Sequence, residues 1–123
     1  MADHSPAFLA LVNEVRSYVR ELPANQLPAV LASQPGLQLI DVREHSEYLA
    51  GHVRGAQWIG KGIIERDIEQ LHPDKHVPLY LYCGGGYRSA LAAANLQKMG
   101  YRNIWSIDGG WRALKELLPT TSA

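Results

Sequence analysis

A single cysteine, Cys83, stands directly before three glycines in segment 83–89, whose sequence is CGGGYRS. Glycines let successive backbone N–H groups turn toward one centre, which forms a cradle for an anion. Arg88 adds a positive charge near the end of this segment. Because both features favour a thiolate, we expect the pKa of Cys83 to lie below the ordinary value of a free thiol. The segment therefore predicts a nucleophilic cysteine that acts on an anionic substrate or forms an anionic covalent intermediate. A structural cysteine before a glycine turn is the simpler alternative.

The neighbouring segments place this thiol between a strand and a helix. An apolar run, 79–82, leads into Cys83, and an alanine-rich stretch with helical character, 90–99, follows the glycines. A helix N-terminus adds unpaired N–H groups and a partial positive charge. In open parallel sheets, ligands bind beyond the carboxyl ends of the strands. The expected position of Cys83 therefore agrees with its expected chemistry.

Strands and helices alternate along most of the chain. We expect strands at 37–42, 56–59, 79–82 and 103–107, and helices at 25–32, 44–49, 63–71, 90–99 and from about 110 onward. Such alternation is typical of a mainly parallel sheet. The sequence thus predicts an α/β fold with a central, mainly parallel sheet and helices on both faces.

The two ends of the chain are expected to lie outside this pattern. Ser5 and Pro6 form a helix start, and apolar residues then recur at helical spacing from Phe8 to Leu22. We predict one amphipathic helix within 1–24 that packs on a domain formed by 25–118. Self-association through its apolar face is a weaker option. Residues 119–123 are expected to form a frayed tail.

The composition excludes several classes of protein. A length of 123 residues suits one domain, and twelve basic residues offset twelve acidic ones. A chain without net charge or basic clusters gives no signal for nucleic acid or for an acidic membrane. No apolar segment approaches the roughly 20 residues that span a bilayer, and the apolar stretch 7–12 is too short for a signal peptide.

The cysteine and histidine content bounds the redox and metal chemistry. One cysteine excludes an internal disulfide, a cysteine-based metal cluster and a dithiol cycle within one chain. The histidines show no metal-ligand spacing, so we expect no metal. A reducing, cytoplasmic setting fits this content best.

Four segments, in order, resemble the motifs of the rhodanese family of sulfurtransferases. They are DVRE at 41–44 with Glu47 and Tyr48 after it, GHVRGA at 51–56, CGGGYR at 83–88 and DGGW at 108–111. Each motif alone is common, whereas four in this order and spacing are specific, and they cover roughly residues 25–118. The resemblance implies a rhodanese-like fold and a transferase that needs no cofactor. Cys83 would take sulfur from thiosulfate or a persulfide and pass it to cyanide or a thiol.

The resemblance also implies roles for the residues around Cys83. Backbone N–H groups of the loop would hold the persulfide; the loop residues are Gly84, Gly85, Gly86, Tyr87, Arg88 and Ser89. Asp41 would pair with Arg88, and Arg43 would brace the same loop. A local salt bridge of Asp41 and Arg43 without a catalytic role is an equal alternative. His52 lies in a motif that is mainly structural, so we expect a structural histidine.

Two alternatives to a turnover enzyme share the same loop. A sulfur carrier or regulatory binding module would accept sulfur from one protein and pass it to another, with a sulfur-relay protein as its partner. A phosphatase-like or arsenate-reducing enzyme is disfavoured, because the related enzymes on this fold have one residue more between cysteine and arginine than the four found here. Segment 84–87 carries no charge, which leaves thiosulfate, a protein persulfide, a small persulfide and a polysulfide all open as the sulfur donor.

Overall fold

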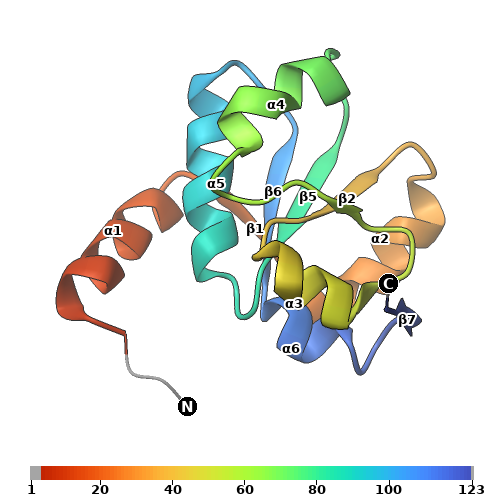
Figure 1. The fold of residues 1–123 in the computed structure, drawn as a ribbon. Helices are drawn as coiled ribbons and strands as arrows, with labels where there is room; N and C mark the ends of the chain where they lie inside the picture. Colours follow the sequence, from red (N-terminus) through yellow and green to blue (C-terminus); the bar gives the residue numbers. More distant parts are fainter. Residues whose placement is uncertain (1–3, 123) are drawn as a thin grey trace.

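The computed structural model describes residues 4–122, and its centre is a parallel sheet of five strands (Figure 1). The strands are β1 (Arg20–Pro23), β2 (Gln38–Asp41), β4 (Gln57–Trp58), β5 (Leu79–Tyr82) and β6 (Ile104–Asp108). Their order across the sheet is β1-β6-β5-β2-β4, and every neighbouring pair is parallel. β5, the strand that leads to Cys83, thus lies in the middle of the sheet.

Helices cover both faces of this sheet, which confirms the predicted α/β architecture. They are α1 (Pro6–Arg16), α2 (Leu27–Ser33), α3 (His45–Ala50), α4 (Ile64–Leu71), α5 (Tyr87–Lys98) and α6 (Gly110–Leu114), with a short 3-10 helix, η1 (Ala24–Gln26), before α2. α1, α4 and α5 contribute buried residues to one cluster, and η1, α2 and α6 contribute to a second. No helix within 4–122 is both long enough and apolar enough to cross a membrane.

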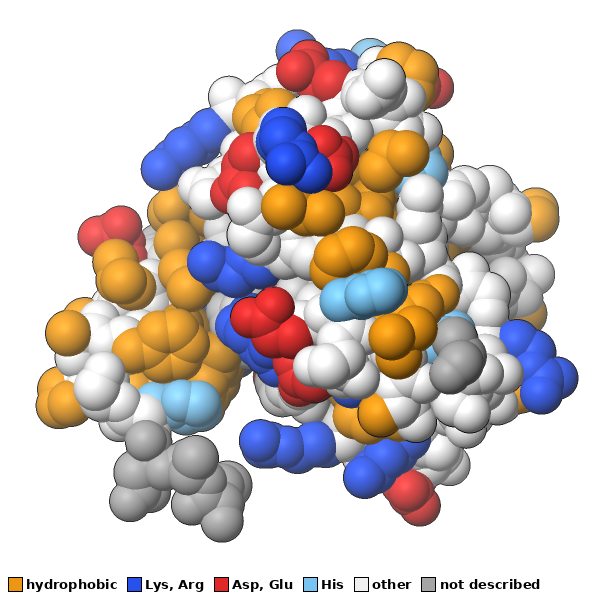
Figure 2. All heavy atoms as spheres, in the orientation of Figure 1, with side chains coloured by type: hydrophobic (Ala, Val, Ile, Leu, Met, Phe, Trp, Pro, Cys, Tyr) orange, Lys and Arg blue, Asp and Glu red, His pale blue; other side chains and the backbone are white. Residues whose placement is uncertain are grey.

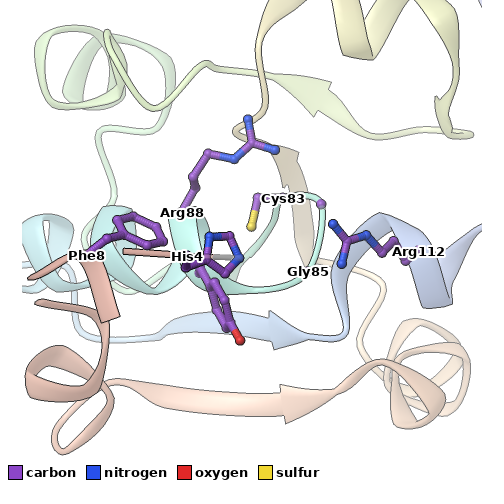
Figure 3. Close-up of a pocket in the computed structure, with 8 residues that line it drawn as sticks. His4, Phe8, Cys83, Gly85, Arg88 and Arg112 are labelled. Atoms are coloured by element: carbon purple, nitrogen blue, oxygen red, sulfur yellow. The ribbon is translucent and has the colours of Figure 1, made fainter. Parts of the chain in front are cut away.

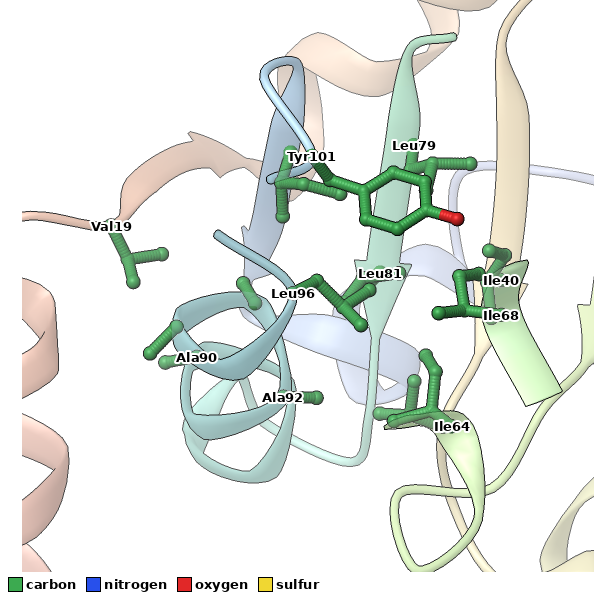
Figure 4. Packing of buried hydrophobic residues seen from close by; sticks show 14 of the residues in the cluster. Val19, Ile40, Ile64, Ile68, Leu79, Leu81, Ala90, Ala92, Leu96 and Tyr101 are labelled. Atoms are coloured by element: carbon green, nitrogen blue, oxygen red, sulfur yellow. The ribbon is translucent and has the colours of Figure 1, made fainter. Parts of the chain in front are cut away.

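The alternating side chains of β5 connect the two clusters. Leu79 and Leu81 pack on the face covered by α4 and α5 (Figure 4), whereas Tyr80 and Tyr82 pack on the opposite face. Successive side chains of a strand point to opposite faces, so a central strand with both faces covered is apolar throughout. All four residues of β5 are buried. The end of this strand, where Cys83 follows, is therefore held by packing from both sides.

The prediction of one helix reaching to Leu22 was wrong. α1 ends at Arg16, and Arg20 to Pro23 form β1, which pairs with β6 at the edge of the sheet. Val19 and Leu22 are buried in opposite clusters, so the same apolar residues fit the two faces of a sheet edge. β1 supplies hydrogen-bond partners that β6 would otherwise lack, and a proline is tolerated at such an edge. The sheet therefore begins within the segment assigned to the N-terminal helix.

The predicted frayed tail was also wrong for the residues that the structure describes. Thr120 and Thr121 form β7, which pairs antiparallel with β3 (His52–Val53). The Arg54 N–H also donates to the Pro119 carbonyl oxygen at 2.9 Å. These backbone bonds hold the end of the chain against the segment that follows α3. Residue 123 lies outside the described residues.

Candidate active site at the start of α5

Cys83 lies at the base of a cavity of about 330 Å³ at the carboxyl end of β5 (Figure 3). The cavity is lined by His4, Phe8, Cys83, Gly84, Gly85, Tyr87, Arg88 and Arg112. The side chain of Cys83 is only 1% exposed. α5 begins at Tyr87, three residues earlier than predicted, so Tyr87, Arg88 and Ser89 form its first turn. The N–H groups of a first turn have no partners within their helix, which leaves them available to the thiol.

Hydrogen bonds favour the thiolate form of Cys83. The Gly86 N–H donates to Sγ at 3.1 Å, and the Ser89 Oγ lies 3.5 Å from Sγ. Burial raises the pKa of the Cys83 thiol, but bonds from the Ser89 hydroxyl and from the backbone N–H groups of Ser89, Gly86 and Gly85 together lower it below its ordinary value. This direction confirms the sequence-based prediction, and a stabilised thiolate is what a nucleophile requires.

A second serine stands behind Ser89. The Oγ atoms of Ser89 and Ser106 lie 2.8 Å apart, and both side chains are fully buried. A hydroxyl has one hydrogen to donate and can accept as well. When Ser106 donates to Ser89, the hydrogen of Ser89 is free to point at Sγ of Cys83. The pair thus places a polar partner for the thiolate in an otherwise apolar layer.

The start of α6 holds the glycine loop in shape. The Trp111 N–H donates to the Cys83 carbonyl oxygen at 2.7 Å, and the Arg112 N–H donates to that of Gly84 at 3.1 Å. The Gly109 N–H donates to the Gly85 carbonyl oxygen at 3.2 Å. These bonds direct the loop carbonyls away from the cavity. The N–H groups of the same loop are thereby left to face the sulfur.

Two glycines are required by this close contact. Gly110 has a φ of +49°, and a Cβ on it would collide with the Cys83 carbonyl oxygen. Gly86 has a φ of +110°, and a Cβ on it would lie 3.2 Å from the Ile107 carbonyl oxygen. Residues with a side chain rarely adopt such φ values. Both positions therefore favour glycine for two reasons, the backbone conformation and the lack of space for a Cβ. The DGG motif and the CGGG motif therefore fit together as one unit.

The predicted pair of Asp41 and Arg88 was wrong. Arg88 instead forms two bonds with Glu47 on α3, at 2.9 Å (Nη1–Oε1) and 3.3 Å (Nη2–Oε2). This hydrogen bond from Arg88 is the main cause that lowers the pKa of the Glu47 carboxyl. Charge on Cys83 also interacts with Arg88. Arg88 thus binds a carboxylate directly and interacts with the charge of the thiolate through space.

Asp41 instead forms a buried pair with Arg43, the local salt bridge that the sequence left open. The Arg43 Nη2 lies 2.7 Å from Asp41 Oδ2, and Nε lies 3.0 Å from Oδ1. The same guanidinium donates to the Gly51 carbonyl oxygen at 2.6 Å and stacks 4.7 Å from the Trp111 ring. No hydrogen bond joins Arg43 to loop 83–89, so the bracing of this loop that the resemblance implies is not a direct one. Arg43 instead contacts Trp111, whose N–H donates to the Cys83 carbonyl oxygen.

Several residues of the site were not predicted from the sequence. Glu47 was noticed only as part of a motif, although its place on α3 just beyond the end of β2 was a usable signal. Ser106 is a lone hydroxyl within an otherwise largely apolar strand, which was a second signal. His4, Phe8 and Arg112 line the cavity without any local signal for a role there.

The histidines and acidic residues that the structure describes show no metal site. Among residues 4–122, no group of three His, Cys, Asp or Glu side chains could hold a metal ion. Nδ1 of His52 lies 2.8 Å from the Tyr48 carbonyl oxygen, and the two rings stack with centroids 3.6 Å apart. These contacts fit the predicted structural role of His52.

Comparison with known protein families now decides the family. The sequence profile of the Rhodanese-like domain matches residues 24–117. This chain belongs to the rhodanese-like family. The structure agrees: a solved protein of unknown function from Rhodopseudomonas palustris, RPA3614, described as a possible tyrosine phosphatase, has a TM-score of 0.81 and 25% identity, and the match covers 98% of this chain and 99% of that one.

Curated members of the rhodanese-like family resemble this chain to different extents. A "Thiosulfate sulfurtransferase GlpE" from Tolumonas auensis is 31% identical over 79% of this chain and 90% of its own length. The "Uncharacterized protein YqhL" of Bacillus subtilis is 40% identical over 61% of this chain, and the match spans 58% of YqhL. The "Putative sulfur carrier protein YrkF" of the same organism is 28% identical over 81% of this chain and 53% of its own length. The chain therefore spans little more than half the length of two of these relatives.

Proposed function

We propose that this protein is a sulfurtransferase that carries a sulfane sulfur as a persulfide on Cys83. In the first step, the Cys83 thiolate attacks the outer sulfur of thiosulfate, an S–S bond forms, and sulfite leaves with the electron pair of the broken bond. A persulfide donor would react in the same way and release its thiolate. In the second step, cyanide or a thiolate takes the outer sulfur, and the Cys83 thiolate is restored. This is covalent catalysis by two successive displacements, and it needs no cofactor.

The observation that carries the proposal is the set of donors that converge on Sγ. The Gly86 N–H and the Ser89 hydroxyl lie within 3.1 Å and 3.5 Å, and bonds from the loop lower the pKa of Cys83. Preorganised donors of this kind stabilise negative charge in a site with little water. They suit a thiolate before the reaction and the negative charge of a persulfide after the first step.

A relative and the loop sequence bear on which molecule donates the sulfur. The GlpE relative is named a thiosulfate sulfurtransferase, and the match covers 90% of it. The interior of the loop has no charge, so it should bind thiosulfate less well than a loop with a basic residue. A persulfide or a polysulfide, including the persulfide of a sulfur-relay protein, then becomes the favoured physiological donor. We place this chemistry in a reducing, cytoplasmic setting, because a lone active thiol is preserved there.

Turnover of thiosulfate with cyanide tests the proposal. We expect thiocyanate formation well above the uncatalysed rate, and initial rates at several fixed cyanide concentrations should give parallel double-reciprocal lines, as double displacement requires. Cys83→Ser should abolish the activity, whereas Ser33→Ala, at an exposed serine on α2, should leave it unchanged.

A sulfur carrier is the second candidate, favoured by the uncharged loop and by the name of the YrkF relative. A carrier would form the Cys83 persulfide but turn over thiosulfate and cyanide at a rate near background. Persulfide formation without turnover would therefore select the carrier and reject the turnover enzyme.

A phosphatase activity, as the description of RPA3614 suggests for that protein, is the third candidate. The structure gives a reason against it here, because the Arg88 guanidinium is held by Glu47. An arginine bound in this way is less available to an incoming phosphate. Robust hydrolysis of an aryl phosphate that depends on Cys83 would overturn this argument.

A further inference from the structure

The mouth of the active-site cavity has an aromatic wall that is formed by His4 just before α1, Phe8 on α1 and Tyr87 at the start of α5. The rings of His4 and Tyr87 meet edge to face at 4.5 Å, and the Phe8 ring lies 6.2 Å from Tyr87. His4 and Phe8 lie outside residues 24–117, which match the family profile. Two of the three wall residues thus come from the segment that precedes the matched domain, and Tyr87 comes from within it.

Several contacts fix the wall in place. The Arg16 guanidinium lies 4.8 Å above the Tyr87 ring and is itself bonded to Glu21 at 3.1 Å. Arg16 also lies 3.7 Å from the Asp108 carboxylate, just before the glycines of α6. α1 is thus tied to β1 and to the loop that shapes the active site. Phe8 is half-buried and lines the same cavity as Cys83.

Arg112 lies on the opposite side of Cys83 from His4 and Phe8, as Figure 3 shows. Its Nη1 lies 3.6 Å from the point that a Cβ on Gly85 would occupy, so the guanidinium covers the rim of the loop. Among residues 4–122 no carboxylate pairs with Arg112, whereas Arg88, the other arginine of the cavity, is bound to Glu47. Figure 2 shows the contrast around this hollow: apolar side chains and a histidine gather over α1, and charged side chains face them.

The volume of the cavity exceeds what an inorganic sulfur anion needs. About 330 Å³ lies at the lower end of the range for pockets that bind small organic molecules. Thiosulfate and cyanide are anions of only a few atoms and would leave the aromatic wall without contact. An apolar wall opposite a guanidinium that pairs with no carboxylate among residues 4–122 suits a ligand with a carbon body and an anionic group.

We propose that this cavity binds a small organic thiol that carries a carboxylate and an apolar or aromatic carbon body, with the carboxylate at Arg112 and the body against His4, Phe8 and Tyr87. The proposal rests on the sulfurtransferase function above and names its acceptor class. The acceptor thiol passes its proton to the outer sulfur of the Cys83 persulfide anion, and the resulting acceptor thiolate attacks that sulfur and forms a new S–S bond. The bond from that sulfur to Sγ breaks, Cys83 leaves as a thiolate, and the proton stays on the transferred sulfur. The acceptor leaves as an organic persulfide, and no further oxidant or reductant is required.

Four acceptors that differ in one property at a time test this proposal. The Cys83 persulfide is first formed with thiosulfate or with cysteine persulfide, and excess donor is removed. The rate of sulfur loss is then measured with thioglycolate and β-mercaptoethanol, which differ in the carboxylate, and with thiosalicylate and thiophenol, which differ in the same way on an aromatic ring. Rates of a variant are compared with those of the wild type for each acceptor, so that the intrinsic reactivity of each thiol cancels.

The two walls should respond to different acceptors. Arg112→Gln should slow transfer to the two carboxylates by about two- to fivefold, the range of an exposed charge pair, and leave the two neutral thiols unchanged. Phe8→Ala should slow transfer to the two aromatic thiols by about three- to tenfold, as expected for loss of an aromatic contact. Arg102→Gln and Leu11→Ala remove an exposed arginine and an exposed apolar residue elsewhere and should change none of the four rates.

The outcomes separate this proposal from the function on which it rests. Equal effects of each variant on all four acceptors, or transfer from the loaded protein to cyanide but to none of the thiols, would overturn the acceptor class and leave the sulfurtransferase intact. A Cys83 that neither donor converts to the persulfide would overturn the sulfurtransferase function and this proposal together.

Discussion

At the scale of single residues, the reactivity of Cys83 depends on neighbours that differ in kind. Uncharged donors, the Gly86 N–H and the Ser89 hydroxyl, contact Sγ directly. The charged pair of Arg88 and Glu47 acts from farther away and partly cancels itself. Direct donors in a buried site lose little strength to solvent, whereas half-exposed charges are screened. The hydrogen bonds therefore contribute more to the thiolate than the arginine does.

Replacement of the Ser89 hydroxyl tests this ranking. Ser89→Ala removes a bond that lowers the pKa of Cys83, so we expect that pKa to rise. The thiolate fraction at neutral pH then falls, and the pH profile of alkylation by iodoacetamide shifts to higher pH. Ser89→Thr keeps a hydroxyl and should shift less, and Ser33→Ala should not shift the profile. An alkylation profile of Ser89→Ala that overlays the wild type would contradict the role given to Ser89.

Substitutions of Arg88 and of Glu47 should shift the pKa of Cys83 in opposite directions. Arg88→Ala removes a positive charge near Sγ, so the pKa of Cys83 should rise. Glu47→Gln leaves that charge without its carboxylate, so the pKa of Cys83 should fall. Alkylation profiles of the two variants measure both shifts. Shifts of equal sign would show that the pair acts only by holding the loop in shape.

The pH dependence of this pair follows from Glu47. Arg88 lowers the pKa of the Glu47 carboxyl, so the pair contributes its full stability above the ordinary pKa of a glutamate. That contribution is lost as the pH falls through the lowered value. Because both side chains are about a third exposed, the contribution is at most about 1 kcal/mol.

At the scale of elements, the site is a joint between the β5–α5 loop and the start of α6. Three N–H groups near that start bind three successive loop carbonyls, from Cys83 to Gly85. The joint allows no side chain at Gly110, where the two backbones meet. The closing DGG motif therefore serves the active site although it lies more than twenty residues after Cys83.

Addition of a methyl group at this joint should disturb stability and chemistry together. Gly110→Ala meets the Cys83 carbonyl oxygen and must also adopt a positive φ, so we expect a loss of about 1–3 kcal/mol in the free energy of unfolding. Urea denaturation measures this loss, and alkylation reports the displaced thiol. Gly62→Ala adds its methyl group to open space and should stay within about 0.5 kcal/mol of the wild type. An unaffected Gly110→Ala would show that the joint is loose.

Local patterns predicted some elements well and others poorly, for a physical reason. The sequence predicted that a strand leads to Cys83 and that glycines and a helix follow it. These elements were predictable because apolar periodicity and glycines are local signals that span only a few residues. β1 was not, because Val19 and Leu22 satisfy both a helical spacing and the two faces of an edge strand. Its pairing with β6, and that of β7 with β3, depends on distant backbone groups.

The partner of Arg88 could not be decided from the sequence. Asp41 is the last residue of β2 and Glu47 follows on α3, so the sequence allowed either carboxylate to reach the loop. Asp41 is taken by Arg43 only two residues away, a pairing whose short connection costs little chain entropy. The lining by Phe8 and Arg112 was equally hidden, because it depends on how α1 and α6 pack around the cavity.

At the scale of the whole molecule, the fold concentrates chemistry at one point of a neutral chain. The net charge is zero, so attraction of an anionic donor relies on the local arginines and N–H groups rather than on an overall field. β5 lies in the middle of the sheet and is packed on both faces, which fixes the position of Cys83. α1, α3, α5, β6 and α6 then each contribute to its surroundings. Since the chain has one thiol, any sulfur gained at a thiol is gained at Cys83.

The intact mass of the protein after incubation with a sulfur donor tests the central claim most directly. We predict that thiosulfate or cysteine persulfide adds the mass of one sulfur atom, that cyanide removes it, and that Cys83→Ala gains nothing. If cysteine persulfide adds this mass and thiosulfate does not, the donor is a persulfide. A wild-type mass unchanged by both donors would contradict the account of Cys83 as a sulfur-carrying nucleophile.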